Sequence, residues 1–390
     1  SLYNAHCIWK SHSNYKVSSK ASFQSKLNSN YIGAKKVLNK IKSHEDLEKF
    51  FMSAISFAKQ LVENNNAIQW IINKNYNVNL VFGINQIDIL KEIISQADSK
   101  NVLCINYEYW SIIVYFILIM EKAPNNIFVL DRNNIFISAV LAGNVFSILE
   151  ERLDSSYFIS QTVVNGLFIY LRFLFSINIL IDGCGLDVTE FKYWDKLNKK
   201  KIKEFLMNFN YLITTNYDKI IEQITNRNVR HLHGEFSETS KIILYQSLSV
   251  NLYGKKIDLS SVILGDYFSG KTFFINTAQL STKNYPNTPF YYYSEILKEI
   301  NIKNNSNTIV IFGLCPDNDY HIIRDLQCNL GLKSSQIIFC YFDDYAKYRF
   351  LEVYEKCIRY SEEFNIAVRN NINLSLINTQ EILDKYFIKT

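Results

Sequence analysis

Residues 211–234, YLITTNYDKIIEQITNRNVRHLHG, decide the interpretation of this sequence. A short apolar strand is expected first, and it ends in TTNYD at 214–218; a helix and then HLHG at 231–234 follow. A second apolar strand, at 308–312, ends in a comparable way, in GLCPDND at 313–319. Because ligands bind beyond the carboxyl ends of the strands in open α/β sheets, both segments predict a functional site.

Short apolar runs alternate with helical patterns along most of the chain, which predicts an α/β fold with a Rossmann-like, mostly parallel sheet. The expected strands are 79–83, 101–106, 126–131, 209–213, 229–232, 241–245, 308–312 and 336–342. The expected helices include 87–94, 291–302, 321–330, 345–364 and 379–387, and residues 177–181 are either helix or a further strand.

Three segments are expected. Residues 1–75 form an N-terminal helical segment, with a loose polar lead-in over 1–30 and then a helical hairpin in which Ser43 starts the second helix. Residues 76–345 form the α/β domain, with a helical module at about 133–181 and, at 250–290, an irregular, lid-like stretch that has short elements of its own. Residues 346–390 form a C-terminal helical segment.

Composition limits the classes of protein. The 390 residues are 48% hydrophobic and carry a net charge of only +5, as in a globular protein without a nucleic-acid patch. The basic run 196–203 is expected to be a solvated helix face or linker. The apolar runs 109–120 and 158–181 are interpreted as buried helices rather than membrane spans. Seven scattered cysteines without a CxxC pair, and no signal pattern, indicate a reduced, cytoplasmic location.

In their order and spacing, TTNYD, HLHG and FGLCPDND resemble the SIR2-like (sirtuin-like) family of bacterial anti-phage defence proteins, including related bacterial proteins with TTNYD and His-Gly motifs. The resemblance covers roughly a third of the chain. It implies that Asn216 and Asp218 meet the nicotinamide ribose and carboxamide of NAD, and that His233 is the general base. The further NAD-binding positions that it implies are Thr214, Thr215, Gly234, Gly313 and Asp319.

The chemistry suits these residue types. Cleavage of a nicotinamide–ribose bond develops positive charge on the sugar. An amide such as that of Asn216 can fix ribose hydroxyls and water. A neutral histidine can accept the proton of the attacking water or ribose hydroxyl. Three alternatives stay open. Asn216 and Asp218 could cap the following helix, His231 could be the base in place of His233, and Asp319 could be a turn residue. We expect Asp317 and Asn318 to be turn residues and His321 to lie on a helix face.

A glycine-rich loop after the first strand lets the backbone approach a pyrophosphate. The best-placed candidate is VFGIN at 81–85, in which Gly83 and Asn85 would contact NAD; Gly183-Cys184-Gly185 is the alternative. The two CxxC pairs of the protein deacylases are absent, so NAD hydrolysis is expected rather than peptide deacylation, with no metal.

The resemblance therefore predicts an NAD glycohydrolase that releases nicotinamide and ADP-ribose. It also implies a regulated defence effector with a phage-derived or protein activator and self-association. One alternative is a SIR2-like module that binds a nucleotide as a sensor without turnover. The other is a nucleotide-sugar transferase, a class that the strand–helix alternation and the GCG turn at 183–185 also fit.

Overall fold

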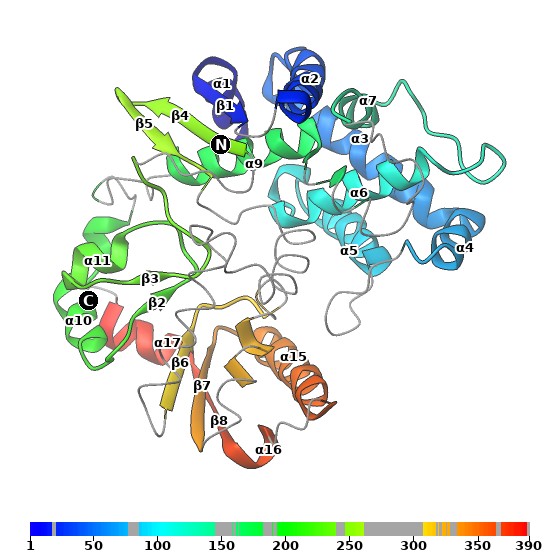
Figure 1. Ribbon diagram of the computed structural model, residues 1–390. Coiled ribbons are helices and arrows are strands. Elements are labelled where there is room, and N and C mark those ends of the chain that lie inside the picture. The colour runs from blue at the N-terminus through cyan, green and yellow to red at the C-terminus, as the bar shows by residue number, and fades with distance from the viewer. Residues whose placement is uncertain are drawn as a thin grey trace. The chain divides into compact units, whose positions relative to one another are not determined.

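The computed structural model describes residues 1–17, 21–76, 86–144, 158, 161–162, 164–181, 189, 193–238, 246–260, 307–316, 319, 322–324, 326–327, 334–363 and 368–387. The chain divides into two compact units (Figure 1). The first unit combines Ser1–Leu186 with Gly234–Thr288, and the second combines Asp187–His233 with Pro289–Thr390. Each unit is therefore assembled from two separate stretches of sequence.

Helices make up most of the described part of the first unit, coloured from blue to green in Figure 1. They are α1 (Leu2–His12), α2 (Ala21–Leu38), α3 (His44–Glu63), α4 (Asn65–Asn73), α5 (Gln86–Ser99), α6 (Trp110–Met120), α7 (Ile135–Ala142) and α9 (Gly166–Ile179). Two short 3-10 helices, η1 (Val102–Cys104) and η2 (Tyr107–Tyr109), lie between α5 and α6.

The two helices of the predicted hairpin are confirmed as α2 and α3, but they pack mainly against other helices, α2 against α7 and α9, and α3 against α5 and α7. Ser43 caps α3, because its hydroxyl accepts from the Asp46 N–H at 3.1 Å while Asp46 accepts from the Ser43 N–H at 3.1 Å. This reciprocal capping box satisfies N–H groups that have no partner within the helix. The buried residues of α3 recur every three or four positions and form a single apolar face: Leu47, Phe50, Phe51, Ala54, Ile55, Phe57, Ala58 and Leu61.

The two most apolar helices lie in the core of the first unit. Every residue of α6 is buried, and α9 is buried along nearly its whole length. The prediction of buried helices in these runs is confirmed where they are described, and residues 177–179 belong to α9 rather than to a strand. Among the described residues, no helix has the length and apolarity needed to cross a membrane.

Glycine allows α2 and α7 to approach closely. A Cβ built on Gly33 would lie 2.0 Å from the backbone oxygen of Ala142, a distance that real Cβ atoms do not reach. Gly166 at the start of α9 is equally confined, with the Asn30 carbonyl oxygen 2.5 Å from such a Cβ. The Asn30 amide also donates to the Val164 carbonyl oxygen, so the helices are joined by hydrogen bonds as well as by packing.

A three-stranded antiparallel sheet, in the order β1-β4-β5, completes the described part of the first unit. Its strands are β1 (Ser13–Val17), β4 (Gln246–Leu252) and β5 (Lys255–Asp258). Tyr253 and Gly254 connect β4 to β5 with φ angles of 52° and 74°, the positive pair that a tight hairpin turn requires. The stretch 250–290 was expected to be irregular with short elements of its own; its first nine residues complete this hairpin, and residues 261–290 lie outside the described residues.

Three sequence-based assignments in the first unit are wrong. Residues 1–30 are not a loose lead-in, because α1 buries Leu2, Ala5, His6 and Trp9 on one face and β1 pairs with β4. Residues 101–106 contain the 3-10 helix η1. The Leu103 N–H donates to the Asn101 side chain, and the Cys104 N–H donates to the Asn101 backbone carbonyl. Residues 126–131 are not a strand; the N–H groups of Ile127 and Phe128 instead close a turn onto the Pro124 carbonyl oxygen.

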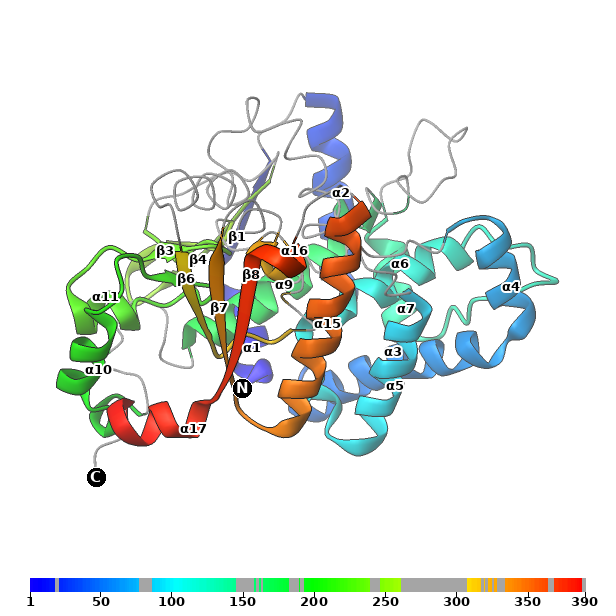
Figure 2. The same cartoon turned by 90° about the horizontal axis from the view of Figure 1, so that it is seen from below.

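The described strands of the second unit are all parallel to their neighbours. β6 (Asn307–Phe312), β7 (Ser335–Tyr341) and β8 (Ile372–Asn378) lie side by side in that order, coloured yellow, orange and red in Figure 2. A separate parallel pair joins β2 (Ile213–Thr214) to β3 (Arg230–His231). The helical elements are η5 (Trp194–Lys196), α10 (Lys199–Leu206), α11 (Ile220–Thr225), α15 (Asp344–Glu363), α16 (Val368–Asn371), α17 (Thr379–Ile382) and the π-helical turn η7 (Leu383–Phe387).

Of the predicted order strand–helix–strand–helix, the two strands and the second helix are confirmed as β6, β7 and α15, whereas the predicted helix 321–330 lies partly outside the described residues. Parallel strands need a crossover, and α15 supplies the one between β7 and β8. Phe350 of α15 stacks on Phe339 of β7, with ring centroids 3.7 Å apart, which holds the helix against the sheet. Strand β8 was not expected, since 346–390 was interpreted as helical. The chain is thus a mixed helix-and-strand protein with a small parallel sheet.

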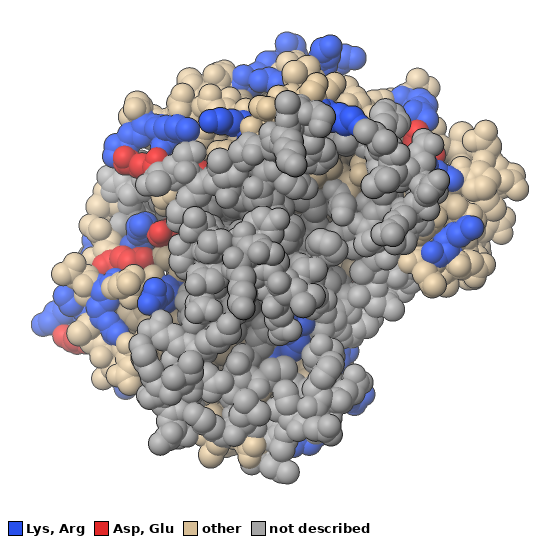
Figure 3. Space-filling view, viewed as in Figure 1, with Lys and Arg blue, Asp and Glu red and all other residues tan. Residues whose placement is uncertain are grey.

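The basic run forms a solvated helix face, as predicted. Lys200, Lys201 and Lys203 are exposed on α10, while Ile202 is buried. At the lower left of Figure 3, where Figure 1 labels α10, basic and acidic side chains lie next to each other. The lysines are therefore part of a surface of mixed charge on this face.

Candidate functional site

The pairing of β2 with β3 brings the two main motifs together. Thr214 lies opposite His231 in parallel register, and the Thr214 carbonyl oxygen accepts from the Leu232 N–H at 2.8 Å. Asn216 and His233 each follow two residues later. Because parallel strands end at the same edge of a sheet, both residues leave the pair on the same side.

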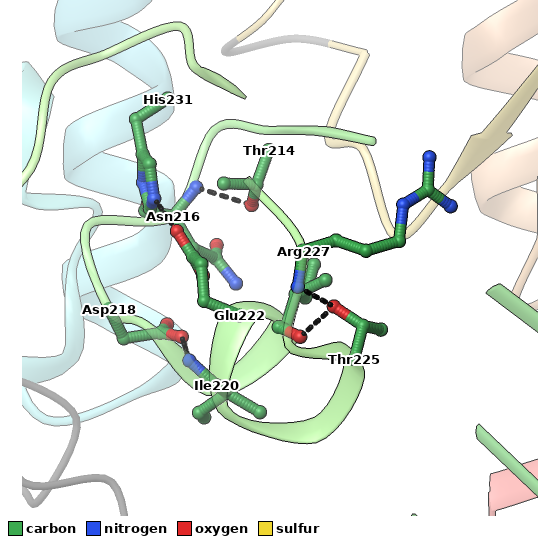
Figure 4. A network of polar contacts seen from close by, with 9 residues as sticks. Thr214, Asn216, Asp218, Ile220, Glu222, Thr225, Arg227 and His231 are labelled. Atoms are coloured by element: carbon green, nitrogen blue, oxygen red, sulfur yellow. Dashed lines mark hydrogen bonds and ion pairs between the residues drawn. The ribbon is translucent and has the colours of Figure 1, made fainter. Parts of the chain in front are cut away.

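The loop after β2 is held by its own side chains (Figure 4). The Thr214 hydroxyl oxygen accepts from the Asn216 N–H at 3.0 Å, and the Asp218 carboxylate accepts from the Ile220 N–H at 2.9 Å. Asp218 therefore satisfies the first N–H group of α11 from the position before the N-cap residue Lys219, which corresponds in part to the capping alternative. Asn216 itself is exposed, and Thr215 is half-buried.

Asp218 is less acidic than an ordinary aspartate. Burial raises the pKa of its carboxyl group, and the nearby Glu222 carboxylate acts in the same direction. The Ile220 N–H and the His231 ring oppose this shift. Partial burial makes the charged form of this carboxyl group less favourable, so the group is better suited to accept hydrogen bonds than to carry an exposed charge.

His231 is held by protein groups at both ring nitrogens. Its Nδ1 lies 2.7 Å from the Asn216 carbonyl oxygen, and its Nε2 lies 2.6 Å from Glu222 Oε1 (Figure 4). Only 5% of its side chain is exposed. Since α11 contributes the glutamate and the loop after β2 contributes the carbonyl, one imidazole joins three elements of the sequence motif.

His233 has a different environment. It is buried, and its Nε2 lies 3.8 Å from Asp319 Oδ1, an ion-pair distance that is longer than a hydrogen bond. Asp319 follows β6 and is buried as well, and its backbone N–H donates to the Cys315 carbonyl oxygen at 2.9 Å. The tertiary structure thus joins two residues from motifs that lie far apart in the sequence.

Two predicted glycines have the backbone that glycine favours. Gly234, directly after His233, has a φ of 84°, and Gly313, directly after β6, has a φ of 71°. None of the described residues lies within 4 Å of a Cβ built on Gly313, so they leave the end of β6 open there. A side chain at either position would force a conformation that other residues rarely adopt.

Several predicted positions lie outside the described residues. These are Gly83 and Asn85 of the first candidate loop, Gly183, Cys184 and Gly185 of the second, and the turn and helix residues Asp317, Asn318 and His321. The described part of the site therefore consists of the residues around β2, β3 and the end of β6.

Two residues that support the site had not been singled out. Glu222 holds His231, and Arg227 donates from its guanidinium group to the carbonyl oxygens of Leu206 at 3.2 Å, Phe209 at 2.7 Å and Asn210 at 2.7 Å. Arg227 thereby fixes the end of α10 and the chain that enters β2. Their spacing in the sequence gave no signal of either role.

Glu222 and His231 are also ligand types that bind divalent metals. Their facing atoms are 2.6 Å apart, so a metal ion bound by both would have to displace the contact between them. The described geometry of this pair is that of a hydrogen-bonded support.

Comparison with protein-family models, with curated proteins and with solved structures gives no match to this chain. The resemblance to SIR2-like proteins therefore remains a hypothesis that depends on the sequence motifs alone.

Proposed function

We propose that this protein is a SIR2-like NAD glycohydrolase that releases nicotinamide and ADP-ribose. The observation that carries the proposal is the His233–Asp319 pair, in which a buried histidine next to a carboxylate lies two residues beyond a strand end. A carboxylate beside a histidine stabilises the imidazolium that forms when the ring accepts a proton. In the proposal, Asn216 is the second essential side chain.

The reaction would proceed by displacement at the ribose. The bond between C1′ and the nicotinamide nitrogen breaks, and its electron pair leaves with nicotinamide. A water oxygen bonds to C1′ and gives its proton to His233, while Asn216 fixes the ribose hydroxyls and the water. Asp218 orients the nicotinamide carboxamide, and the open backbone at Gly313 accommodates the adenosine half.

The same proposal extends to the fold and the setting. The parallel sheet β6-β7-β8 and the separate parallel pair β2–β3 support the proposal of a Rossmann-like nucleotide-binding fold. The enzyme would act in the cytoplasm as an anti-phage effector, controlled by a phage-derived or protein activator and by self-association.

The test is nicotinamide release from NAD by the full chain, measured beside Asn216→Ala and His233→Ala. His12→Ala, which removes an exposed histidine from α1, is the matched control. Loss of turnover in the two site variants and not in His12→Ala supports the proposal. Turnover that persists in both site variants would refute the assigned site. NAD binding without turnover in the unmodified chain would favour the sensor interpretation, and neither binding nor turnover would exclude both.

A further inference from the structure

The contacts of His231 define which hydrogen each nitrogen holds. A carbonyl oxygen can only accept, so Nδ1 must carry a hydrogen to bond to the Asn216 carbonyl oxygen at 2.7 Å. Nε2 faces a glutamate carboxylate at 2.6 Å, the short distance typical of a charge-assisted hydrogen bond. Both in-plane directions of the ring are therefore occupied by protein groups.

Asn216 is held on both sides as a result. Its N–H donates to the Thr214 hydroxyl, and its carbonyl oxygen accepts from His231. The residue is outside regular secondary structure, so these two bonds take the place of a sheet ladder or helix in fixing its backbone. The exposed amide side chain then projects from a backbone of defined orientation.

We infer that His231 is a positioning residue that fixes the Asn216 backbone through its Nδ1–H, with Glu222 of α11 holding the ring. The inference deepens the proposed function, because it assigns the general-base role to His233 and excludes His231 from it. The imidazole can act as a base only by breaking one of its two bonds. Its effect on the reaction passes through Asn216.

Histidine-selective 15N NMR of the full chain tests the contact without reference to activity. The signal of His231 is identified by its absence from the His231→Asn variant. We expect a hydrogen on Nδ1 of His231 at neutral pH, protected from exchange with solvent, and a change in this signal when Glu222→Ala removes the support. A bare Nδ1 in the unmodified protein would overturn the inference.

Kinetics of two matched variants test the consequence. In His231→Asn the amide nitrogen takes the place of Nδ1 and can still donate to the Asn216 carbonyl oxygen, whereas the amide of His231→Gln reaches toward the place of Nε2. Loss of one such hydrogen bond corresponds to about tenfold in rate. We expect kcat for nicotinamide release to be about tenfold lower in His231→Gln than in His231→Asn, with KM and the pH profile of His231→Asn unchanged.

The possible failures are distinguishable. Equal, large losses in both variants together with an altered pH profile would make His231 the base, and no loss in either would remove it from the site; both results overturn the inference. Melting temperatures of the variants identify a failure to fold, and in that case the NMR result decides. Absence of both NAD binding and turnover in the unmodified chain would remove the proposed function but leave the NMR test of the contact intact.

Discussion

The His233–Asp319 pair gives the most direct prediction about catalysis. At a separation of 3.8 Å, an imidazolium and a carboxylate attract each other by about 4 kcal/mol at an effective dielectric constant of about 20. Screening by solvent is small, because only 6% and 11% of the two side chains are exposed. In the proposed mechanism this attraction exists only after His233 has accepted a proton, so it should lower the barrier and leave substrate binding nearly unchanged.

Asp319→Asn removes the charge and keeps the size of the side chain. We expect kcat for nicotinamide release to fall by a factor of up to about 10³, with KM nearly constant. The matched control is Glu238→Gln, which removes a carboxylate from the exposed ion pair with Lys255 and should leave kcat unchanged. If Asp319→Asn retains kcat within about threefold of the unmodified value while His233→Ala is inactive, the carboxylate does not assist the histidine.

Three further predictions concern stability. Arg227→Lys cannot reproduce the forked hydrogen bonds to three carbonyl oxygens, so the free energy of unfolding of the second unit should fall by about 2–4 kcal/mol. Hydrogen exchange in α10 should accelerate, and unchanged exchange there would contradict the role assigned to Arg227. Gly33→Ala places a Cβ 2.0 Å from a backbone oxygen of α7 and should cost about 3 kcal/mol or more, seen as a lower melting temperature or loss of soluble protein; a variant that melts with the unmodified chain would disprove the close approach. Burial lowers the pKa of His6 from an ordinary 6.5 to about 4. Between pH 6.5 and pH 4 the unfolded chain therefore binds a proton at His6 that the folded chain does not. The free energy of unfolding should fall by about 3 kcal/mol as the pH drops across this range. His6→Asn, which does not titrate, should lack this component, and equal acid sensitivity of the two proteins would refute it.

The sequence determined the elements that depend on local patterns. The helices α2 and α3 were predictable because apolar residues recur at helical spacing and Ser43 precedes an acidic first turn. The strands β6 and β7 and the helix α15 were predictable for the same kind of reason. The helix α1 also carries a local signal, with Leu2, Ala5 and Trp9 at helical spacing, which was outweighed by the polar composition around it.

Elements stabilised by distant partners were not predictable in this way. Strand β1 is polar and pairs with β4, more than 200 residues along the chain, while residues 101–106 and 126–131 have strand-like composition but form a 3-10 helix and a turn. An apolar run becomes a strand only when a neighbour accepts its hydrogen bonds, and composition does not identify that neighbour.

The same division applies to the site. The sequence alone identified Asn216, Asp218, His233 and Asp319 as residues near strand ends, but it left His231 open as an alternative to His233 as the base. The tertiary structure separated them, because α11 brings Glu222 to one ring while the end of β6 brings Asp319 toward the other. Which hydrogens a histidine holds, and therefore what it can do, depends on groups that are close in space and distant in sequence.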